Sequence, residues 1–170
     1  NRHKVTLWEY DKEYAHTLNE YRENFYYLPK IKIPEKINIS CEISEAVKSA
    51  DLIVVATPTQ FIRSVIEHIK DIDFTNRVIL SVSKGIENHS LMTVSQIFQD
   101  VFKNIQKKNI TVLSGPSHAE EVAKHIPTAV AAAGYEEKNS EVIQKAFSNK
   151  YFRVYKSSDV VGVELGGALK

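Results

Sequence analysis

Residues 51–60 decide the fold class of this 170-residue chain, because they join a buried strand to the start of a helix. The stretch reads Asp-Leu-Ile-Val-Val-Ala-Thr-Pro-Thr-Gln. Its continuous apolar run is typical of a strand that is covered on both faces. Thr57 as N-cap, Pro58 in the first turn and Gln60 after them predict a helix that starts with a capping box and runs to about residue 70.

The same alternation of strand and helix recurs on both sides of this stretch. We expect strands at 4–8, 37–41, 77–82, 110–113, 128–133 and 152–155. We expect helices at 12–24, 42–49, 90–103, 117–124, 140–147 and from 159 onward, with a loop at 27–34. Strands that alternate with helices predict an α/β protein with a parallel sheet.

Composition excludes several classes of function. Lys and Arg total 22 against 21 Asp and Glu, and this balance argues against a nucleic-acid binder and a polybasic membrane surface. The single cysteine, Cys41, excludes an intramolecular disulfide and a multi-cysteine metal site, and the six histidines show no metal-ligand spacing. We therefore expect no metal, no signal peptide, no integral membrane segment and a cytoplasmic location.

Ligands bind at the carboxyl ends of the strands in an open α/β sheet, so the segments after the strands are the candidate site. Asp11 follows the first strand, where a carboxylate can accept hydrogen bonds from a ribose; a solvated acid is the alternative. Lys84 follows the 77–82 strand, where it can reach a phosphate or carbonyl oxygen; a solvated loop lysine is the alternative. Gly115 and Pro116 force a tight turn after the 110–113 strand.

The helix expected after this turn has a second capping-box pattern, formed by Ser117 and Glu120. Exposed amides at such a helix start favour anions, although a well-capped helix without a ligand is an equal alternative. At the C-terminal end, Gly162 and Gly166 fall on one helix face, as close packing of backbones requires. Lys170 can be interpreted as a general acid or base or as a surface lysine, and the residues alone leave both interpretations open.

Together and in this order, these segments resemble the NAD(P)-dependent glycerol-3-phosphate dehydrogenases of the bacterial type. The resembling segments run from end to end of the chain: 5–8, 27–29, 50–53, 58–60, 83–87, 113–121, 127–130, 151–155 and 162–170.

The resemblance implies a Rossmann-like, largely parallel sheet with flanking helices in a dinucleotide-binding domain at 1–157. Residues 158–170 then begin an all-helical second domain. It also implies reversible hydride transfer between NAD(P)H and dihydroxyacetone phosphate, which gives sn-glycerol 3-phosphate for glycerophospholipid synthesis. Compared with the family, the chain begins at the second strand, without the glycine-rich turn, and ends on the catalytic lysine. We therefore expect a partial chain that is inactive by itself.

The resemblance also implies roles for particular residues. Lys170 matches the catalytic lysine, and Lys84 matches a lysine that contacts both cofactor and substrate. Gly115 and Ser117 match substrate contacts. Four further residues match cofactor contacts, the first three of them on the adenosine side: Tyr10, Asp11, Tyr27 and Ala119.

Asp11 departs from the family pattern, because many members carry an arginine there that pairs with the 2′-phosphate of NADP. Asp11 and Glu9 should instead favour a free ribose diol, which predicts a preference for NADH over NADPH. Two alternatives stay open: a related two-domain dehydrogenase for another hydroxy or keto acid, and a non-catalytic nucleotide-binding module. The expected partners are a small phosphate substrate and a second copy of the chain in a homodimer.

Overall fold

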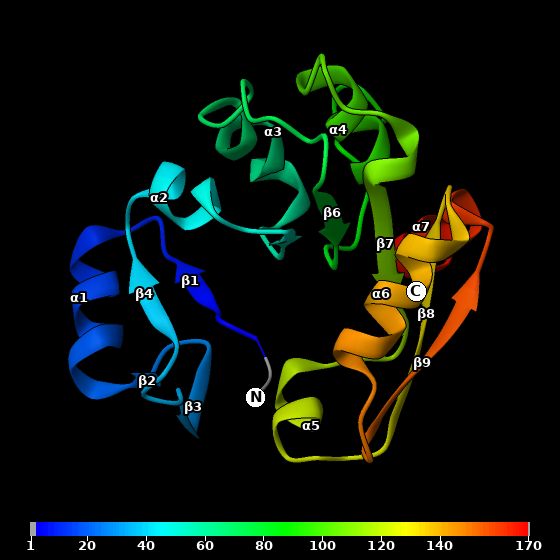
Figure 1. Ribbon diagram of the computed structural model, residues 1–170. Helices are drawn as coiled ribbons and strands as arrows, with labels where there is room; N and C mark the ends of the chain where they lie inside the picture. Colours follow the sequence, from blue (N-terminus) through cyan, green and yellow to red (C-terminus); the bar gives the residue numbers. More distant parts are fainter. Residues whose placement is uncertain (1–2, 170) are drawn as a thin grey trace. The chain divides into compact units, whose positions relative to one another are not determined.

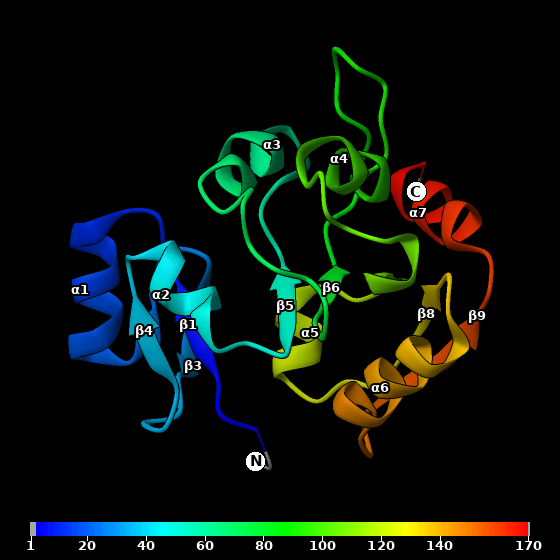
Figure 2. The ribbon, with the colours of Figure 1, turned by 45° about the horizontal axis from the view of Figure 1, so that its top comes forward.

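The computed structural model describes residues 3–169, which form two compact units that divide between Ala50 and Asp51. The first unit contains a parallel pair of strands, β1 (Thr6–Trp8) and β4 (Asn38–Ser40), with Leu7 opposite Ile39. Helices α1 (Lys12–Tyr21) and α2 (Ile43–Lys48) lie against this pair (Figures 1 and 2). These four elements match the expected strands and helices of the first 50 residues.

The first unit differs from expectation after residue 21, where a helix to residue 24 and a loop at 27–34 were predicted. Instead, β2 (Glu23–Asn24) and β3 (Leu28–Lys32) form an antiparallel ribbon. Arg22 ends α1 in the left-handed conformation, with φ at 53°. Its guanidinium donates to the carbonyl oxygens of Pro34, at 2.6 Å, and Ile37, at 2.7 Å. These long-range bonds, which local periodicity does not encode, hold the segment between β3 and β4 against the end of the helix.

The second unit is built on a five-stranded sheet with the order β5-β6-β7-β8-β9. Its strands are β5 (Leu52–Val55), β6 (Val78–Ser81), β7 (Ile110–Ser114), β8 (Thr128–Gly134) and β9 (Phe152–Ser157). Neighbouring strands are parallel except β7 and β8, where Ser114 lies opposite Ala131 in an antiparallel pair. The sheet is therefore largely, but not wholly, parallel.

A short helix lies in the connection between the antiparallel strands β7 and β8. Helix α5 (Ala119–Ala123) has five residues and is about 7–8 Å long, roughly half the length of the five-residue strand that it follows. Helix α5 alone does not return the chain to the end of the sheet where β7 begins, and the residues on either side of α5 do not make that return. Strand β8 therefore starts at the edge where β7 ends.

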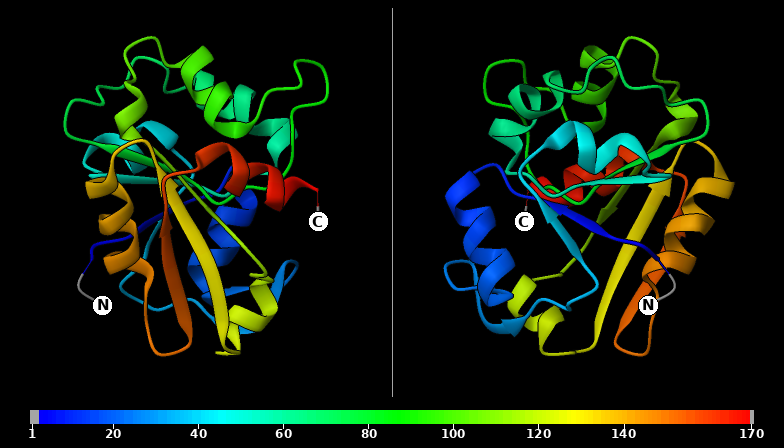
Figure 3. Two further views of the ribbon diagram at one scale, coloured as in Figure 1. Left: turned by 90° about the vertical axis from the view of Figure 1, so that its right-hand side faces the viewer. Right: turned by 60° about the vertical axis from the view of Figure 1, so that its left-hand side comes forward.

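Helices cover both faces of this sheet. On one face, α6 (Glu137–Phe147) packs Ile143 on Leu113 and Ala132. On the opposite face, α7 (Val160–Ala168) packs Val160 on Val112 and Ala133 (Figure 3). Helices α3 (Thr59–Glu67) and α4 (Val94–Val101) lie side by side, and a short 3-10 helix, Lys107–Asn109, precedes β7 (Figure 2). No helix within residues 3–169 is long and apolar enough to cross a bilayer.

Candidate active site

The carboxyl ends of β5, β6 and β7 meet at one edge of the second unit, because these strands are parallel. The antiparallel β8 brings its amino end to the same edge. A Cβ on Gly115 would lie only 3.0 Å from Ala129 O and from the Cα of Val130. The turn after β7 therefore needs a glycine, because the backbone of β8 leaves no room for a side chain there.

Lys84 and Ser117 converge on the carbonyl oxygen of Gly115. The Lys84 ammonium donates to this oxygen at 2.9 Å. The backbone N–H of Ser117 donates to it at 2.9 Å, and the Ser117 hydroxyl lies at 3.4 Å. Two of the expected site residues thus bond to the same backbone oxygen of a third, and the Lys84 side chain is exposed to solvent.

The helix start after this turn differs from the expected capping box. Helix α5 begins at Ala119 with His118 as its N-cap, and His118 makes no side-chain capping bond. Ser117 lies one residue before this N-cap, and both its N–H and its hydroxyl donate to Gly115 O. Ala119 lies exposed in the first turn of α5, on the same edge as Lys84.

The capping box expected at residues 57–60 is also absent. Pro58 is the N-cap of α3, with φ −54° and ψ 136°, so the helix begins one residue later than predicted. Proline has no side-chain acceptor for the first helical amides. The side chains of Thr59 and Gln60 instead bond to the loop that carries Lys84.

The C-terminal end of α7 also reaches this edge. A Cβ on Gly167 would lie 3.6 Å from the Cγ of Lys84 and 3.3 Å from the Cβ of Ser114. The Ser114 hydroxyl is buried beneath α7 and has no hydrogen-bond partner among the described residues. The expected catalytic lysine, Lys170, lies outside the described residues, two positions after Ala168, the last residue of the helix.

The expected close approach through Gly162 and Gly166 is wrong. The atoms nearest to a Cβ on Gly162 all belong to the N-cap side chain of Asp159, and at Gly166 no described atom outside its own helix turn lies within 4 Å of the corresponding point. Val160 faces the sheet, and Gly167, seven residues later, shares its helix face. The apolar contact of Val160 thus determines which glycine approaches the strand ends.

Glu164 links α7 to α4. Its carboxylate accepts hydrogen bonds from the Thr93 hydroxyl at 2.8 Å, the Ser95 N–H at 2.7 Å and the Ser95 hydroxyl at 2.6 Å. An anion is favoured at this position because it faces the first, unpaired amides of α4. Sequence reasoning missed this role, since the partners are 69 or more positions apart.

In the first unit, the expected cofactor residues lie around the start of α1. Asp11 is the N-cap, and its Oδ1 accepts from the N–H of Tyr14 at 2.9 Å. The Glu9 carboxylate accepts from the N–H of Asp11 at 3.1 Å, so two acidic side chains lie at the end of β1. Tyr10 is 75% exposed and Tyr27 is 74% exposed.

Tyr14 connects these residues. Its ring packs edge-on against that of Tyr27 with centroids 6.2 Å apart, and its hydroxyl donates to Asn24 Oδ1 at 2.6 Å. The same oxygen accepts from the Tyr27 N–H at 2.8 Å. Sequence reasoning missed the role of Tyr14 in holding the Tyr27 turn, because the contacts of Tyr14 with Asn24 and Tyr27 lie outside its own helix.

No group of three or more His, Cys, Asp or Glu side chains within residues 3–169 is arranged to hold a metal ion.

Comparison with known families places the chain clearly. The family model described as "NAD-dependent glycerol-3-phosphate dehydrogenase N-terminus" matches residues 1–140. Glycerol-3-phosphate dehydrogenases [NAD(P)+] from Fusobacterium nucleatum and Bacillus subtilis are each 42% identical over all 170 residues. The match covers 50% of the first relative and 49% of the second, so the chain spans about half the length of the curated relatives it matches.

Solved structures agree with the sequence comparison. The crystal structure of glycerol-3-phosphate dehydrogenase from Coxiella burnetii has a TM-score of 0.88 and 29% sequence identity, covering 96% of this chain and 49% of that one. D-Mandelate dehydrogenase with NADH and anilino(oxo)acetate, at 16% identity and a TM-score of 0.63, shares the fold alone.

Proposed function

Because this chain belongs to the family of NAD-dependent glycerol-3-phosphate dehydrogenases, we propose that it is the cofactor-binding part of an oxidoreductase. The reaction is reversible hydride transfer between NADH or NADPH and dihydroxyacetone phosphate, which gives sn-glycerol 3-phosphate for glycerophospholipid synthesis. The observation that carries this proposal is the convergence of Lys84 and Ser117 on Gly115 O, at the strand edge where ligands of this fold class bind.

The acidic end of β1 fits the adenosine side of a nicotinamide dinucleotide. Asp11 and Glu9 are hydrogen-bond acceptors after a parallel strand, and carboxylates there suit the two hydroxyls of a free ribose. The same charges repel a 2′-phosphate. Tyr10 and Tyr27 offer exposed rings in the same unit. This set of side chains favours NADH over NADPH.

Lys84, Ser117 and Gly115 make up the substrate side in this proposal. The Lys84 ammonium attracts the negatively charged substrate and reaches the cofactor from its position beside Gly115. When bound, the cofactor supplies the hydride that reduces the ketone carbon. Lys170 polarises the ketone oxygen and gives a proton to the developing alkoxide, as a general acid does. Ala119 contacts the cofactor from the first turn of α5.

The remaining features of the proposal concern organisation. Residues 1–157 form the dinucleotide-binding domain, and residues 158–170 begin a helical substrate domain. The enzyme is a cytoplasmic homodimer that takes small molecules and no nucleic acid.

The test is turnover of dihydroxyacetone phosphate with NADH by the complete protein and its Lys170→Ala variant. We expect the variant to lose activity by at least about 100-fold while cofactor binding, followed by NADH fluorescence, is retained. Lys145→Ala, which removes an exposed lysine of α6, is the matched control and should keep full activity. A rate for Lys170→Ala equal to that of the control contradicts the mechanism. Preference for another keto acid in a substrate panel would instead overturn the substrate assignment.

A further inference from the structure

The segment between β6 and α4, residues 82–93, carries Lys84 and is here named the Lys84 loop. Its backbone is bound to the first turn of α3. The hydroxyl of Thr59 donates to the carbonyl oxygen of Lys84 at 2.9 Å. The next residue, Gly85, has φ at 122°, a conformation that residues with a side chain rarely adopt. The backbone of Lys84 is therefore held on one side by α3 and on the other by a glycine turn.

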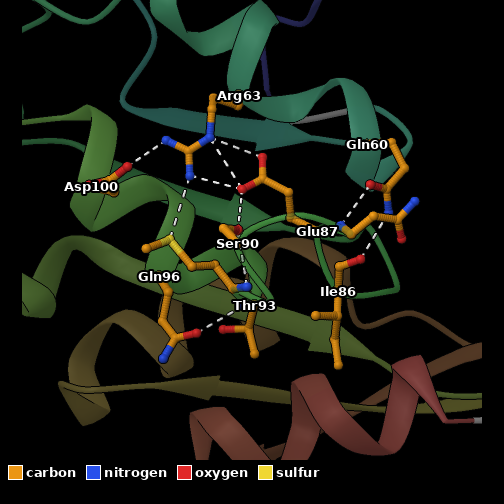
Figure 4. Close-up of polar contacts among 10 residues, drawn as sticks. Gln60, Arg63, Ile86, Glu87, Ser90, Thr93, Gln96 and Asp100 are labelled. Carbon is orange, nitrogen blue, oxygen red and sulfur yellow. Dashed lines mark hydrogen bonds and ion pairs between the residues drawn. The ribbon is translucent and has the colours of Figure 1, made fainter.

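Gln60 makes the second attachment of the Lys84 loop to α3. Its Nε2 donates to the carbonyl oxygen of Ile86 at 2.8 Å, and its Oε1 accepts from the N–H of Asn88 at 3.0 Å. One amide side chain thus satisfies a donor and an acceptor of the loop, on either side of Glu87 (Figure 4).

Arg63 makes the third and most strongly charged attachment. Its Nε donates to Glu87 Oε1 at 3.0 Å, and its Nη2 donates to Glu87 Oε2 at 2.9 Å, a two-bond pairing of guanidinium and carboxylate. Nη1 of Arg63 forms an ion pair with Asp100 of α4 (Figure 4). The Ser90 hydroxyl also bonds to Glu87. The arginine therefore joins α3, the Lys84 loop and α4.

Burial makes this attachment costly to break. Glu87 is only 8% exposed, and the hydrogen bonds from Arg63 and then Ser90 keep its pKa below the ordinary value. Without Arg63, the largely buried carboxylate of Glu87 would lose its main partner. Burial of a charged group costs much free energy unless the group is paired. The loop would then shift to bring Glu87 to water. Lys84, three residues away in the same loop, would shift with it.

We propose that Arg63 and Gln60 are positioning residues for Lys84: they hold the Lys84 loop so that the lysine ammonium stays beside Gly115. One side of α3 carries all three attachments, because the residues that make them are one, three or four positions apart: Thr59, Gln60 and Arg63. The inference rests on the proposed role of Lys84 in the reaction. It assigns a function to an arginine that touches neither Lys84 nor Gly115.

The test is a double-mutant cycle on the complete protein, with kcat/KM for dihydroxyacetone phosphate as the readout. Lys84→Ala should lower kcat/KM by about 100-fold or more, as loss of a charge-stabilising donor does. Arg63→Ala should lower it by about 10- to 100-fold, the effect expected when a reacting group is displaced by around 1 Å. In the Lys84→Ala background, Arg63→Ala should cost less than about 3-fold, because it acts through a side chain that is already gone.

Additive effects of the two substitutions overturn the inference, since Arg63 would then act on activity without Lys84. A kcat/KM unchanged by Lys84→Ala alone overturns the proposed role of Lys84 and, with it, the inference; the single variant shows this outcome separately. Gln60→Ala provides a second double-mutant cycle with the same expected pattern. Because Gln60 is exposed, we expect this variant to fold, so it replaces Arg63→Ala if that variant does not fold.

Asn109→Ala is the control for loss of stability alone. Asn109 is 6% exposed, and its side chain donates to the carbonyl oxygens of Phe74 and Arg77 at the opposite, amino end of β6. We expect this variant to unfold at a lower temperature than the parent but to keep kcat/KM within about 3-fold, because stability effects at distant sites do not couple to the reacting groups. An equal loss of kcat/KM in Asn109→Ala would attribute the Arg63 effect to general destabilisation and overturn the inference.

Discussion

Replacing Glu164 by alanine should loosen the start of α4, although the two segments are far apart in the sequence. In the parent, Glu164 Oε1 accepts from the N–H of Ser95, and Oε2 accepts from the hydroxyls of Ser95 and Thr93. Ser95 is the second residue of α4, so its N–H has no partner within the helix. Its protection from solvent exchange therefore depends on Glu164.

The size of the effect follows from these three bonds. A hydrogen bond to a charged acceptor contributes about 1.5–3 kcal/mol, and the favourable position of an anion at a helix start adds about 0.3–1 kcal/mol. The three bonds share one carboxylate, so their contributions do not simply add. We expect a loss of about 3 kcal/mol in local stability, which corresponds to roughly 100-fold faster exchange of the Ser95 amide hydrogen.

Hydrogen–deuterium exchange, resolved to peptides that contain the start of α4, measures this directly. Glu67→Ala is the matched control, because it removes a glutamate from the end of α3 whose only described ion pair is an exposed one with Lys70. Such a pair contributes about 0–1 kcal/mol, so exchange at Ser95 should not change. If Glu164→Ala exchanges at Ser95 within about 3-fold of this control, the carboxylate does not hold the helix start and the reasoning is refuted.

Three further outcomes are expected. Asp11→Ser keeps a side-chain acceptor for the N-cap bond but removes the charge, so the kcat/KM ratio of NADPH to NADH should rise by about 10-fold; an unchanged ratio contradicts the proposed repulsion. The pKa of Glu87 is lowered in the folded protein by its arginine partner, so its contribution to stability is present above the ordinary glutamate pKa and is lost as the pH falls through the lowered value. The free energy of unfolding in urea should therefore be higher for the parent than for Glu87→Gln at pH 7, and this difference should shrink below about pH 4. A difference that does not change with pH contradicts this prediction. Gly167→Ala places a Cβ against the buried Ser114 hydroxyl and should destabilise the protein by about 1–3 kcal/mol in thermal unfolding. Gly166→Ala is the control: with no described atom within 4 Å, its Cβ should be neutral or stabilising by up to about 1 kcal/mol.

The sequence predicted most elements of the second unit because buried strands and amphipathic helices carry their periodicity locally. The apolar run at 51–56 became β5, and the loops after β6 and β7 hold Lys84, Gly115 and Ser117 as expected. Capping signals were less reliable. In the first predicted box, the Gln60 side chain bonds to Ile86 O, 26 positions away, and such a partner exists only once the chain has folded. In the second, the Ser117 hydroxyl bonds to Gly115 O, two positions back in the turn, instead of to the helix start.

The sequence by itself therefore determined the fold class, the order of strands and helices in the second unit and the strand-end loops where ligands of this class bind, but not the β2–β3 ribbon of the first unit. Only the tertiary structure decided which side chains hold those loops. The pairing of Arg63 with Glu87 and of Glu164 with Ser95 joins residues 24 and 69 positions apart, and the contact of Gly167 with Ser114 depends on how α7 lies on β7. The physical reason is that periodicity reports which face of an element is buried, whereas hydrogen-bond partners and close backbone approaches depend on what that face meets.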